Sequence, residues 1–443
     1  MNYAGLPIFT EVDSEEGVKG SRDPLGIQMV WTTYGRNVVK NLSTITNSPE
    51  SFATLILGIR IIAQLVSVHK IDRNDFINKF LLFEQLCGYS RCLYNIDKEI
   101  DRNGDRGVRG VTRVMNNLRQ DSFDISLASQ ILSDQKVYGI WGLYISSSEA
   151  SGLINKDRSD LNDELLNIES SIKTLVDRYL QKDNELVEKI KKILTNKRTP
   201  INLQKNQDRQ FLQSTARWIK DFIKETKELI FQNKLLFGSP LQQELWQKIN
   251  EISIETQTPY SAAVTPIEIQ HVIQKLPPDS ELRLHLSRML EAEKLLRLVN
   301  QIFYTFLTGL ANKRSEKEIN EIIKIGIKEN IKTYLPIQNK AIEEVFRASD
   351  PVIYKEYWQP LSEFFNREDD NIEHLITILM GLNDRVMQAR KSGGWVNTIN
   401  NEKVLMVPLE PEEEIQSYIS SGPMRYDFFI GSIKNIGFSL ANL

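Results

Sequence analysis

The sequence predicts a mostly α-helical protein, a multi-helix body with antiparallel helix pairs and a small C-terminal β-hairpin. Gly and Pro number only 22 and 15 among 443 residues, so turns are few and long elements are favoured. Apolar residues recur at three- and four-residue spacing through much of the chain, which is the spacing of an amphipathic helix. Near the end, two short apolar runs flank a polar turn, a pattern typical of a hairpin.

Length and texture divide the chain into three expected parts. At roughly 100–200 residues per domain, a chain of 443 residues suggests two or three domains. We expect an N-terminal helical domain over 1–155, an amphipathic, coiled-coil-like helical region over 156–275, and a C-terminal helical domain over 276–443 that ends in the hairpin and a helix. The first boundary marks a change to a charged, heptad-like texture, and the second adjoins a Pro-Pro break.

The N-terminal part begins with a loop-rich stretch over 1–48 that is punctuated by Gly and Pro. The Ser-Pro-Glu sequence at 48–50 predicts a helix start, with Ser as N-cap, Pro at the first helical position and an acid in the first turn. The apolar run 52–68 is broken by Arg and Gln and is shorter than the roughly 20 apolar residues of a membrane span, so we expect a buried core helix. A second helix is expected over about 73–100, with apolar residues on one stripe.

The middle of the chain combines loops with amphipathic helices. Residues 101–110 form the most irregular loop, and a helix is expected to resume near 111. The block 126–154 carries three aromatic residues at three-residue spacing, which predicts one helical face in the core, with a binding groove as the alternative. The heptad-like stretch 156–198 predicts an antiparallel helix pair, and 211–237 predicts a third amphipathic helix.

Capping signals mark the helices of the last part. The sequence Thr-Pro-Ile-Glu at 265–268 is a capping box with Pro at the first helical position. A long helix is expected over 281–311, and a second capping box follows at 315–318. After further helices to about 390, the tail is expected to hold strands over 396–399 and 404–407, joined by a four-residue turn, and a final helix over 428–443.

A first basic segment covers the loop 102–119. The formal net charge of −3 excludes a globally basic nucleic-acid binder but allows a local basic patch. This loop holds five arginines against one acid, and its three glycines let the backbone approach a ligand closely. Guanidinium forks beside bare backbone N–H groups suit a phosphate; the alternatives are arginines paired with acids elsewhere, or a protein interface. The candidate nucleic-acid-binding residues are Arg106, Arg109, Arg113 and Arg119.

A second basic segment spans 189–205 and contains no acid. Lysines gathered in this way attract phosphates without sequence preference and give salt-sensitive binding. The alternative is a solvated helix end, because the helix dipole alone favours cations near a helix C-terminus. The candidate nucleic-acid-binding residues here are Lys191, Lys192, Lys197 and Arg198.

Motifs of common catalytic and cofactor sites are absent from the sequence. The chain has no Gly-x-x-x-x-Gly-Lys-Ser/Thr loop, no Gly-x-Ser-x-Gly elbow and no His-Glu-x-x-His helix. Its four His are scattered and its two Cys lie five residues apart in an expected helix, so neither a metal site nor a disulfide is expected. The Glu-Thr-Lys triplet at 225–227 is similar to part of a metal-dependent nuclease site, but it falls on an amphipathic helix. We therefore expect no catalytic residue, no metal and no cofactor.

Several stretches together carry a family resemblance. They are Gly5-Leu-Pro-Ile-Phe-Thr-Glu-Val-Asp13 with Asp23-Pro-Leu-Gly26, Gly35-Arg-Asn-Val-Val-Lys-Asn-Leu42, Leu132-Ser-Asp-Gln-Lys-Val-Tyr-Gly-Ile-Trp-Gly-Leu143, and the tail from Gly394-Trp395 onward. In the N-terminal third and the tail, the chain resembles an uncharacterised family of bacterial proteins from phage-defence loci, encoded beside ATPases, helicases or nucleases. The motifs of that family have no known catalytic role, so the resemblance assigns no functional residue.

These patterns and this resemblance imply a non-catalytic subunit of a bacterial antiviral defence complex. Its expected partners are proteins (an ATPase, helicase or nuclease subunit), with nucleic acid as a further possible ligand of the two basic segments. The N-terminus lacks the basic region and apolar run of a signal peptide, so the expected location is the cytoplasm, without membrane contact. Two alternatives stay open: a metal-dependent nuclease with an unrecognised site, and a stand-alone nucleic-acid-binding module.

Overall fold

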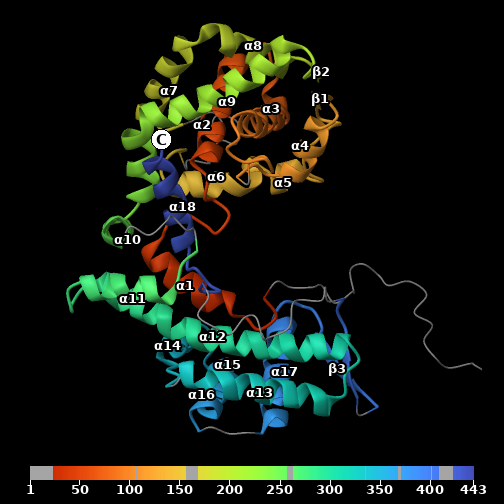
Figure 1. Cartoon of the computed structure of the whole chain (residues 1–443), viewed down its shortest axis with the longest axis vertical. Helices are drawn as coiled ribbons and strands as arrows, with labels where there is room; N and C mark the ends of the chain where they lie inside the picture. The colour runs from red at the N-terminus through yellow and green to blue at the C-terminus, as the bar shows by residue number, and fades with distance from the viewer. Residues whose placement is uncertain are drawn as a thin grey trace, which may run out of the picture. The chain divides into compact units, whose positions relative to one another are not determined.

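The computed structural model confirms a mostly helical fold with a small antiparallel hairpin near the C-terminus (Figure 1). It describes residues 23–105, 107–155, 168–256, 263–334, 336–367, 371–400, 402–408 and 423–443, of which 329–334 are described by their backbone alone. The chain forms two compact units. Unit 1 comprises Met1–Asn37 and Ala263–Phe428, and unit 2 comprises Val38–Ala262 and Phe429–Leu443.

These two units do not coincide with the three parts expected from the sequence. Segments 38–155 and 168–256 belong to one unit, because helices of the second segment pack their apolar faces onto helices of the first. The last helix, α18 (Ile430–Ala441), also belongs to unit 2, although it follows the hairpin of unit 1 in sequence. The changes in residue composition and patterning along the chain therefore do not mark the limits of the two hydrophobic cores.

The core of unit 2 is built on three long helices, α2 (Pro49–Ser67), α3 (Phe76–Asp97) and α9 (Asn206–Thr226), which pack against one another (Figure 1). Ser48 caps α2 as expected, since its Oγ accepts the N–H of Ser51 at 3.2 Å. Among the described helices, α2 alone is long and apolar enough to cross a membrane, yet 72% of its apolar window is buried within the protein. The prediction of a buried helix at this position is confirmed.

Shorter elements complete unit 2. They are the 3-10 helix η1 (Arg73–Asp75), α4 (Val111–Leu118), β1 (Ser122–Ser126), α5 (Gln135–Tyr138), α6 (Ile140–Ala150), α7 (Ser170–Lys182), α8 (Asn184–Thr195), β2 (Arg198–Asn202), the π-helix η3 (Lys227–Leu236) and α10 (Pro240–Thr256). The helix expected near 111 is confirmed as α4. The strands β1 and β2, which pair with each other, were not expected from the sequence.

The three aromatic residues at three-residue spacing do not share one helix. The chain breaks at Gly139, so that Tyr138 ends α5 while Trp141 and Tyr144 lie on α6. Tyr144 is buried, but the side chain of Tyr138 is 53% exposed. The expectation of a single core face therefore holds for α6 and is wrong for Tyr138, because the break turns that residue outward.

The core of unit 1 is the long helix α12 (Glu281–Ala311). Three helices pack against it: α13 (Glu316–Tyr334), α14 (Lys340–Ser349) and α17 (Ile372–Ala389) (Figure 1). Ser315 and Glu318 form the expected capping box at the start of α13: Glu318 Oε2 accepts the N–H of Ser315 at 2.8 Å, and Ser315 Oγ accepts the N–H of Glu318 at 3.4 Å. The other elements are α1 (Gln28–Val38), α11 (Pro266–Lys275), α15 (Pro351–Ile353), η4 (Tyr354–Trp358) and α16 (Gln359–Asn366).

The predicted C-terminal hairpin is confirmed as β3 (Val396–Ile399) paired with β4 (Glu402–Leu405). Its register places Ile399 opposite Glu402, so β4 begins two residues before the expected strand over 404–407. Asn400 adopts a φ of +52°. Asn tolerates this left-handed conformation, which the tightest hairpin turns require, and the turn is therefore shorter than the four residues expected.

Candidate nucleic-acid interface

Strands β1 and β2 form an antiparallel ribbon that brings the two basic segments together. Its register pairs Ser126 at the end of β1 with Arg198 at the start of β2. Arg119 lies just before β1, and Lys197 lies just before β2. The ribbon therefore joins two segments that are far apart in the sequence. Because its strands are antiparallel, Arg119 and Lys197 lie beyond opposite ends of it.

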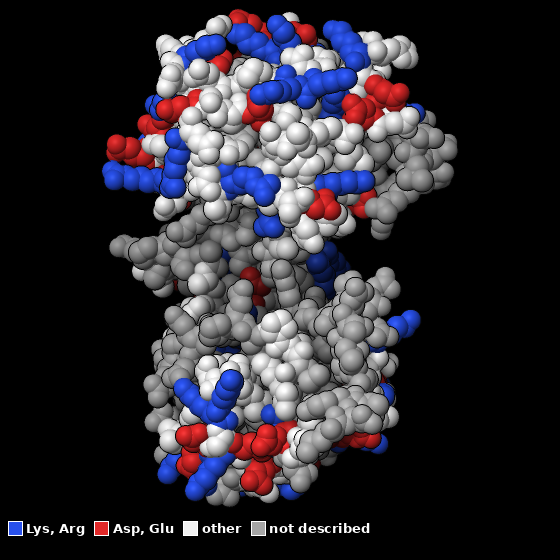
Figure 2. All heavy atoms as spheres, turned by 90° about the vertical axis from the view of Figure 1, so that its right-hand side faces the viewer, with Lys and Arg blue, Asp and Glu red and all other residues white. Residues whose placement is uncertain are grey.

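The predicted cations lie on the ribbon or close to it in the chain, around α4, which packs on β1, and on α8, which precedes β2. Figure 2 shows Lys and Arg side chains spread over one side of unit 2, with acidic side chains between some of them. We call six of the predicted cations on and next to the ribbon the basic face; it consists of Arg109, Arg113, Arg119, Lys192, Lys197 and Arg198. Of the other two predicted residues, Arg106 lies outside the described residues, and Lys191 lies on a compensated part of α8.

The single acid of the first basic segment, Asp105, forms an ion pair with an arginine in the protein interior. Its carboxylate pairs with the buried Arg91 at 2.9 Å and also accepts the N–H of Gly107 at 2.8 Å. Burial alone would lower the pKa of Arg91, but the carboxylates of Asp105 and Glu50 outweigh burial and raise it. Because Asp105 is held by this pair, it does not compensate the exposed arginines of the same segment.

Two glycines of this loop serve the fold itself. Gly104 and Gly110 have φ values of +97° and +74°, in the left-handed region that favours glycine. A Cβ on Gly110 would lie 2.3 Å from the carbonyl O of Ile131, and one on Gly104 would lie 2.7 Å from Sδ of Met115. At these two positions the backbone closely approaches other parts of the protein itself. From the sequence alone, these glycines are instead expected to allow a close approach to a ligand.

Arg109 and Arg113 both reach the segment that follows β1. Nε of Arg109 donates to the carbonyl O of Tyr138 at 3.2 Å, and Nη1 of Arg113 donates to the carbonyl O of Gln130 at 2.7 Å. Each bond uses one of the five N–H donors of a guanidinium group. These bonds to uncharged carbonyls hold the two groups in place without neutralising them. Arg119, at the end of the same segment, is exposed.

One side of α8 is compensated by acids of the same helix. Lys189 pairs with Glu185 at 2.7 Å, and Lys191 pairs with Glu188 at 2.8 Å. The side chain of Lys191 is also only 18% exposed. For these two lysines the alternative interpretation, a solvated and paired helix surface, describes the structure better than a phosphate contact.

The other cations of the second segment remain accessible. Arg198 pairs with Asp124 at 2.8 Å across the ribbon, but its side chain is 70% exposed. Lys192 and Lys197 are exposed and form no ion pair with any residue that the structure describes. Within the described part of the chain, acids therefore balance the positive charge of the basic face only in part.

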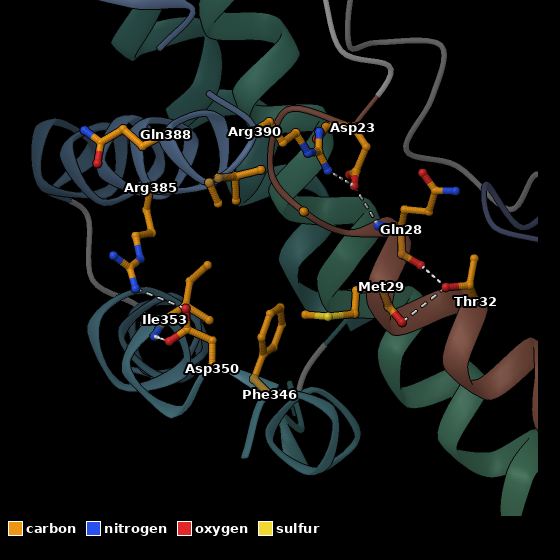
Figure 3. Close-up of a pocket in the computed structure, with 13 residues that line it drawn as sticks. Asp23, Gln28, Met29, Thr32, Phe346, Asp350, Ile353, Arg385, Gln388 and Arg390 are labelled. Atoms are coloured by element: carbon orange, nitrogen blue, oxygen red, sulfur yellow. Dashed lines mark hydrogen bonds and ion pairs between the residues drawn. The ribbon is translucent and has the colours of Figure 1, made fainter. Parts of the chain in front are cut away.

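A separate cavity of about 700 Å³ lies in unit 1 between α1, α14, α15 and α17 (Figure 3). Two ion pairs stand at its rim: Asp350 with Arg385 at 3.2 Å, and Asp23 with Arg390 at 3.0 Å. Both acids also accept backbone N–H groups at the starts of α15 and α1. Figure 3 shows the ring of Phe346 between the side chains of Asp350 and Met29. The rim charges are balanced within the fold, and we assign this cavity no ligand.

Among the residues that the structure describes, no group of three or more His, Cys, Asp or Glu side chains is arranged to hold a metal ion. Glu225, the acid of the nuclease-like triplet, is exposed on α9 and pairs with Lys182. Cys87 and Cys92 are both buried free thiols.

The stretch 132–143, which carries part of the family resemblance, is held by a buried carboxylate that the sequence did not single out. Glu84 on α3 accepts the N–H of Ile140 at 2.6 Å and the side-chain N–H of Gln135 at 3.0 Å. It thereby caps α6, whose own N-cap residue, Gly139, has no side chain. Burial raises the pKa of Glu84 to about 7, against the effect of these bonds. This part of the stretch therefore has a structural role.

No family model, curated protein or solved structure matches the chain. The resemblance to proteins of phage-defence loci therefore stays a prediction. The sequence identified the cations of the basic face but not the ribbon that joins the two basic segments.

Proposed function

We propose that the protein is a non-catalytic subunit of a bacterial antiviral complex, located in the cytoplasm, that binds nucleic acid through the basic face. The observation that carries the nucleic-acid part is the pairing of β1 with β2, which joins two distant basic segments in one ribbon. A phosphate backbone suits such a surface, because each neutralised phosphate releases bound counterions. The antiviral part is supported by the family resemblance.

Exposed apolar side chains beside the basic face support a protein partner. Val137 and Tyr138 are 49% and 53% exposed, and Arg109 donates to the carbonyl of Tyr138. Leu127, just after β1, is 40% exposed. Accessible aromatic side chains and arginines are both enriched in protein interfaces. The proposed partner is an ATPase, helicase or nuclease subunit, which supplies the catalysis.

Charge reversal on the basic face tests the nucleic-acid part. Fluorescence anisotropy with labelled DNA and RNA should give a Kd that rises steeply with salt concentration. Arg113→Glu combined with Lys197→Glu should weaken binding about 10- to 100-fold, since two cations become repulsive. Lys173→Glu with Arg178→Glu on α7 makes the same change of charge away from the ribbon (Figure 1) and should have little effect. Equal losses in the two double variants would refute a specific basic face.

Co-purification tests the subunit part. A tagged chain expressed with its neighbouring genes should retain a partner through purification. Tyr138→Ala should weaken that retention, whereas Leu229→Ala, which changes another exposed apolar side chain on η3, should not. A lone monomer with no retained partner would contradict the proposal.

A cleavage assay tests the non-catalytic part. Pure protein incubated with Mg²⁺ or Mn²⁺ and mixed DNA and RNA should leave the nucleic acid intact. Cleavage that disappears on mutation of a single acid would favour the alternative of a metal-dependent nuclease.

A further inference from the structure

A cavity of about 550 Å³ opens between α8, β2 and α9 in unit 2. Its lining includes Lys192 of the basic face and three residues of β2, at 199–201, which follow Lys197 and Arg198 directly in the chain. The volume lies within the range of small-ligand sites in proteins. We call this space the α8–α9 cavity.

The three acids in the wall of the α8–α9 cavity are engaged by the protein itself. Asp183 caps α8, accepting a backbone N–H of its first turn at 3.2 Å. Asp208 accepts the N–H of Asn202 at 2.9 Å, and Glu185 pairs with Lys189 at 2.7 Å. Because these carboxylates already have partners, their charges are partly offset where an anionic ligand would approach.

One face of α9 presents four further side chains of the wall. Gln207, Gln210, Phe211 and Ser214 stand at positions i, i+3, i+4 and i+7, the spacing of neighbours on one helical face. The three polar side chains form no hydrogen bond with any described residue, and the half-buried ring of Phe211 stacks on no described aromatic ring. This face thus offers amide donors and acceptors around a flat apolar surface.

These groups match the needs of an unpaired base. A single-stranded base is typically held by stacking on an aromatic ring and by hydrogen bonds to its edge, while cations meet the adjacent phosphates. Phe211 supplies the ring, Gln207 and Gln210 supply donors and acceptors, and Lys192 lies on the side of the basic face. A blunt duplex keeps its bases stacked and paired, so it can use the basic face alone.

We propose that the α8–α9 cavity holds an unpaired base of a single-stranded nucleic acid whose phosphates lie on the basic face. This inference rests on the proposed function and adds the class of nucleic acid to it. The protein would then bind single strands in preference to duplex, and the α8–α9 cavity would provide this preference.

Anisotropy of the full chain with a labelled single strand and with the blunt duplex of the same sequence tests the inference. The single strand should bind about tenfold more tightly or better, and Phe211→Ala should remove about tenfold of that affinity without changing duplex binding. Phe211→Trp should keep the affinity, and its fluorescence should be quenched by the single strand. Gln210→Ala should weaken single-strand binding, whereas Gln204→Ala, just outside the cavity, should not. DNA and RNA strands are compared in parallel.

The outcomes separate this inference from the proposed function. Equal affinity for single strand and duplex, or equal loss of both with Phe211→Ala, would overturn the inference while the basic face still binds. Absence of any nucleic-acid binding would overturn both. If circular dichroism shows that Phe211→Ala does not fold, the fluorescence of Phe211→Trp and the loss with Gln210→Ala decide: no quenching and no loss would overturn the inference.

Discussion

Replacing Glu84 by Gln should remove a pH dependence from the stability of unit 2. The carboxyl group is buried, and it accepts the N–H of Ile140 and the side-chain N–H of Gln135. Burial raises the pKa of Glu84 from 4.5 to about 7, and these two bonds together with the charge of Arg109 offset burial only in part. An ionised Glu84 is therefore costly in the folded protein at neutral pH.

The size and sign of this pH dependence follow from the pKa values of Glu84 in the unfolded chain and in the folded protein. A rise from 4.5 to about 7 corresponds to about 3 kcal/mol, at about 1.4 kcal/mol for each pH unit. Because the folded-state pKa is the higher one, the folded protein keeps a proton that the unfolded chain releases as the pH rises. The stabilising contribution is complete below about pH 4.5 and is lost as the pH rises through about 7.

Urea unfolding followed by circular dichroism, between about pH 5 and pH 8, measures this contribution. The free energy of unfolding of Glu84→Gln relative to wild type should increase by about 2 to 3 kcal/mol across that range. The new amide brings a second N–H₂ group towards Gln135, but the cost of that contact is the same at every pH. Glu228→Gln, which removes an exposed carboxylate of η3, is the control. A difference between Glu84→Gln and wild type that does not change with pH would refute the reasoning.

Two further substitutions test the loop of the first basic segment. Asp105→Asn should destabilise unit 2 by about 3 kcal/mol in urea unfolding, because it leaves the buried Arg91 without its carboxylate. A loss of stability near zero would contradict a stabilising role of this ion pair. Gly110→Ala and Gly152→Ala both place a side chain at positive φ, at a cost of about 1 kcal/mol each. The loss at Gly110 should be clearly larger, since its Cβ would lie 2.3 Å from a carbonyl O and that of Gly152 3.7 Å from a flexible lysine; equal shifts in Tm would contradict this.

Helix starts could be predicted from the sequence where neighbouring residues alone determine them. Ser48 caps α2, and Oγ1 of Thr265 accepts the N–H of Glu268 at 3.1 Å, as the two capping patterns indicate. The pairing of Lys191 with Glu188, three residues earlier on the same helix, could be read from the sequence in the same way. Each of these interactions spans only three residues, so a local pattern contains both partners.

The ribbon of the candidate interface could not be found by such reasoning. Each strand has five residues, so the alternation in β1 rests on Phe123 and Ile125 alone. The strand β2 contains Pro200, which has no N–H for the ladder and is normally evidence against a strand. The paired residues are separated by all of α5 to α8, and only the folded chain shows that the two basic segments meet.

The burial of Glu84 could not be predicted from the sequence either, because it also depends on residues that are distant in the chain. An acid within an apolar helix stripe is ordinarily expected to reach solvent, and nothing near it in the sequence indicates otherwise. Its partner, the N–H of Ile140, comes from 56 residues further along the chain. The signal that could have found it is indirect: α6 begins at a glycine, which cannot cap the helix with its own side chain.

Arg109 connects this buried carboxylate with the basic face. Burial raises the pKa of Glu84, and the positive charge of Arg109 opposes that rise. A phosphate bound at Arg109 would offset this charge, so nucleic-acid binding and protonation of Glu84 should favour each other near pH 7. If phosphate binding raised the pKa of Glu84 by about half a pH unit more, the affinity for nucleic acid would change about threefold. Anisotropy at constant ionic strength should therefore show wild type gaining more affinity than Glu84→Gln from pH 8 to pH 6, and parallel pH profiles would exclude the coupling.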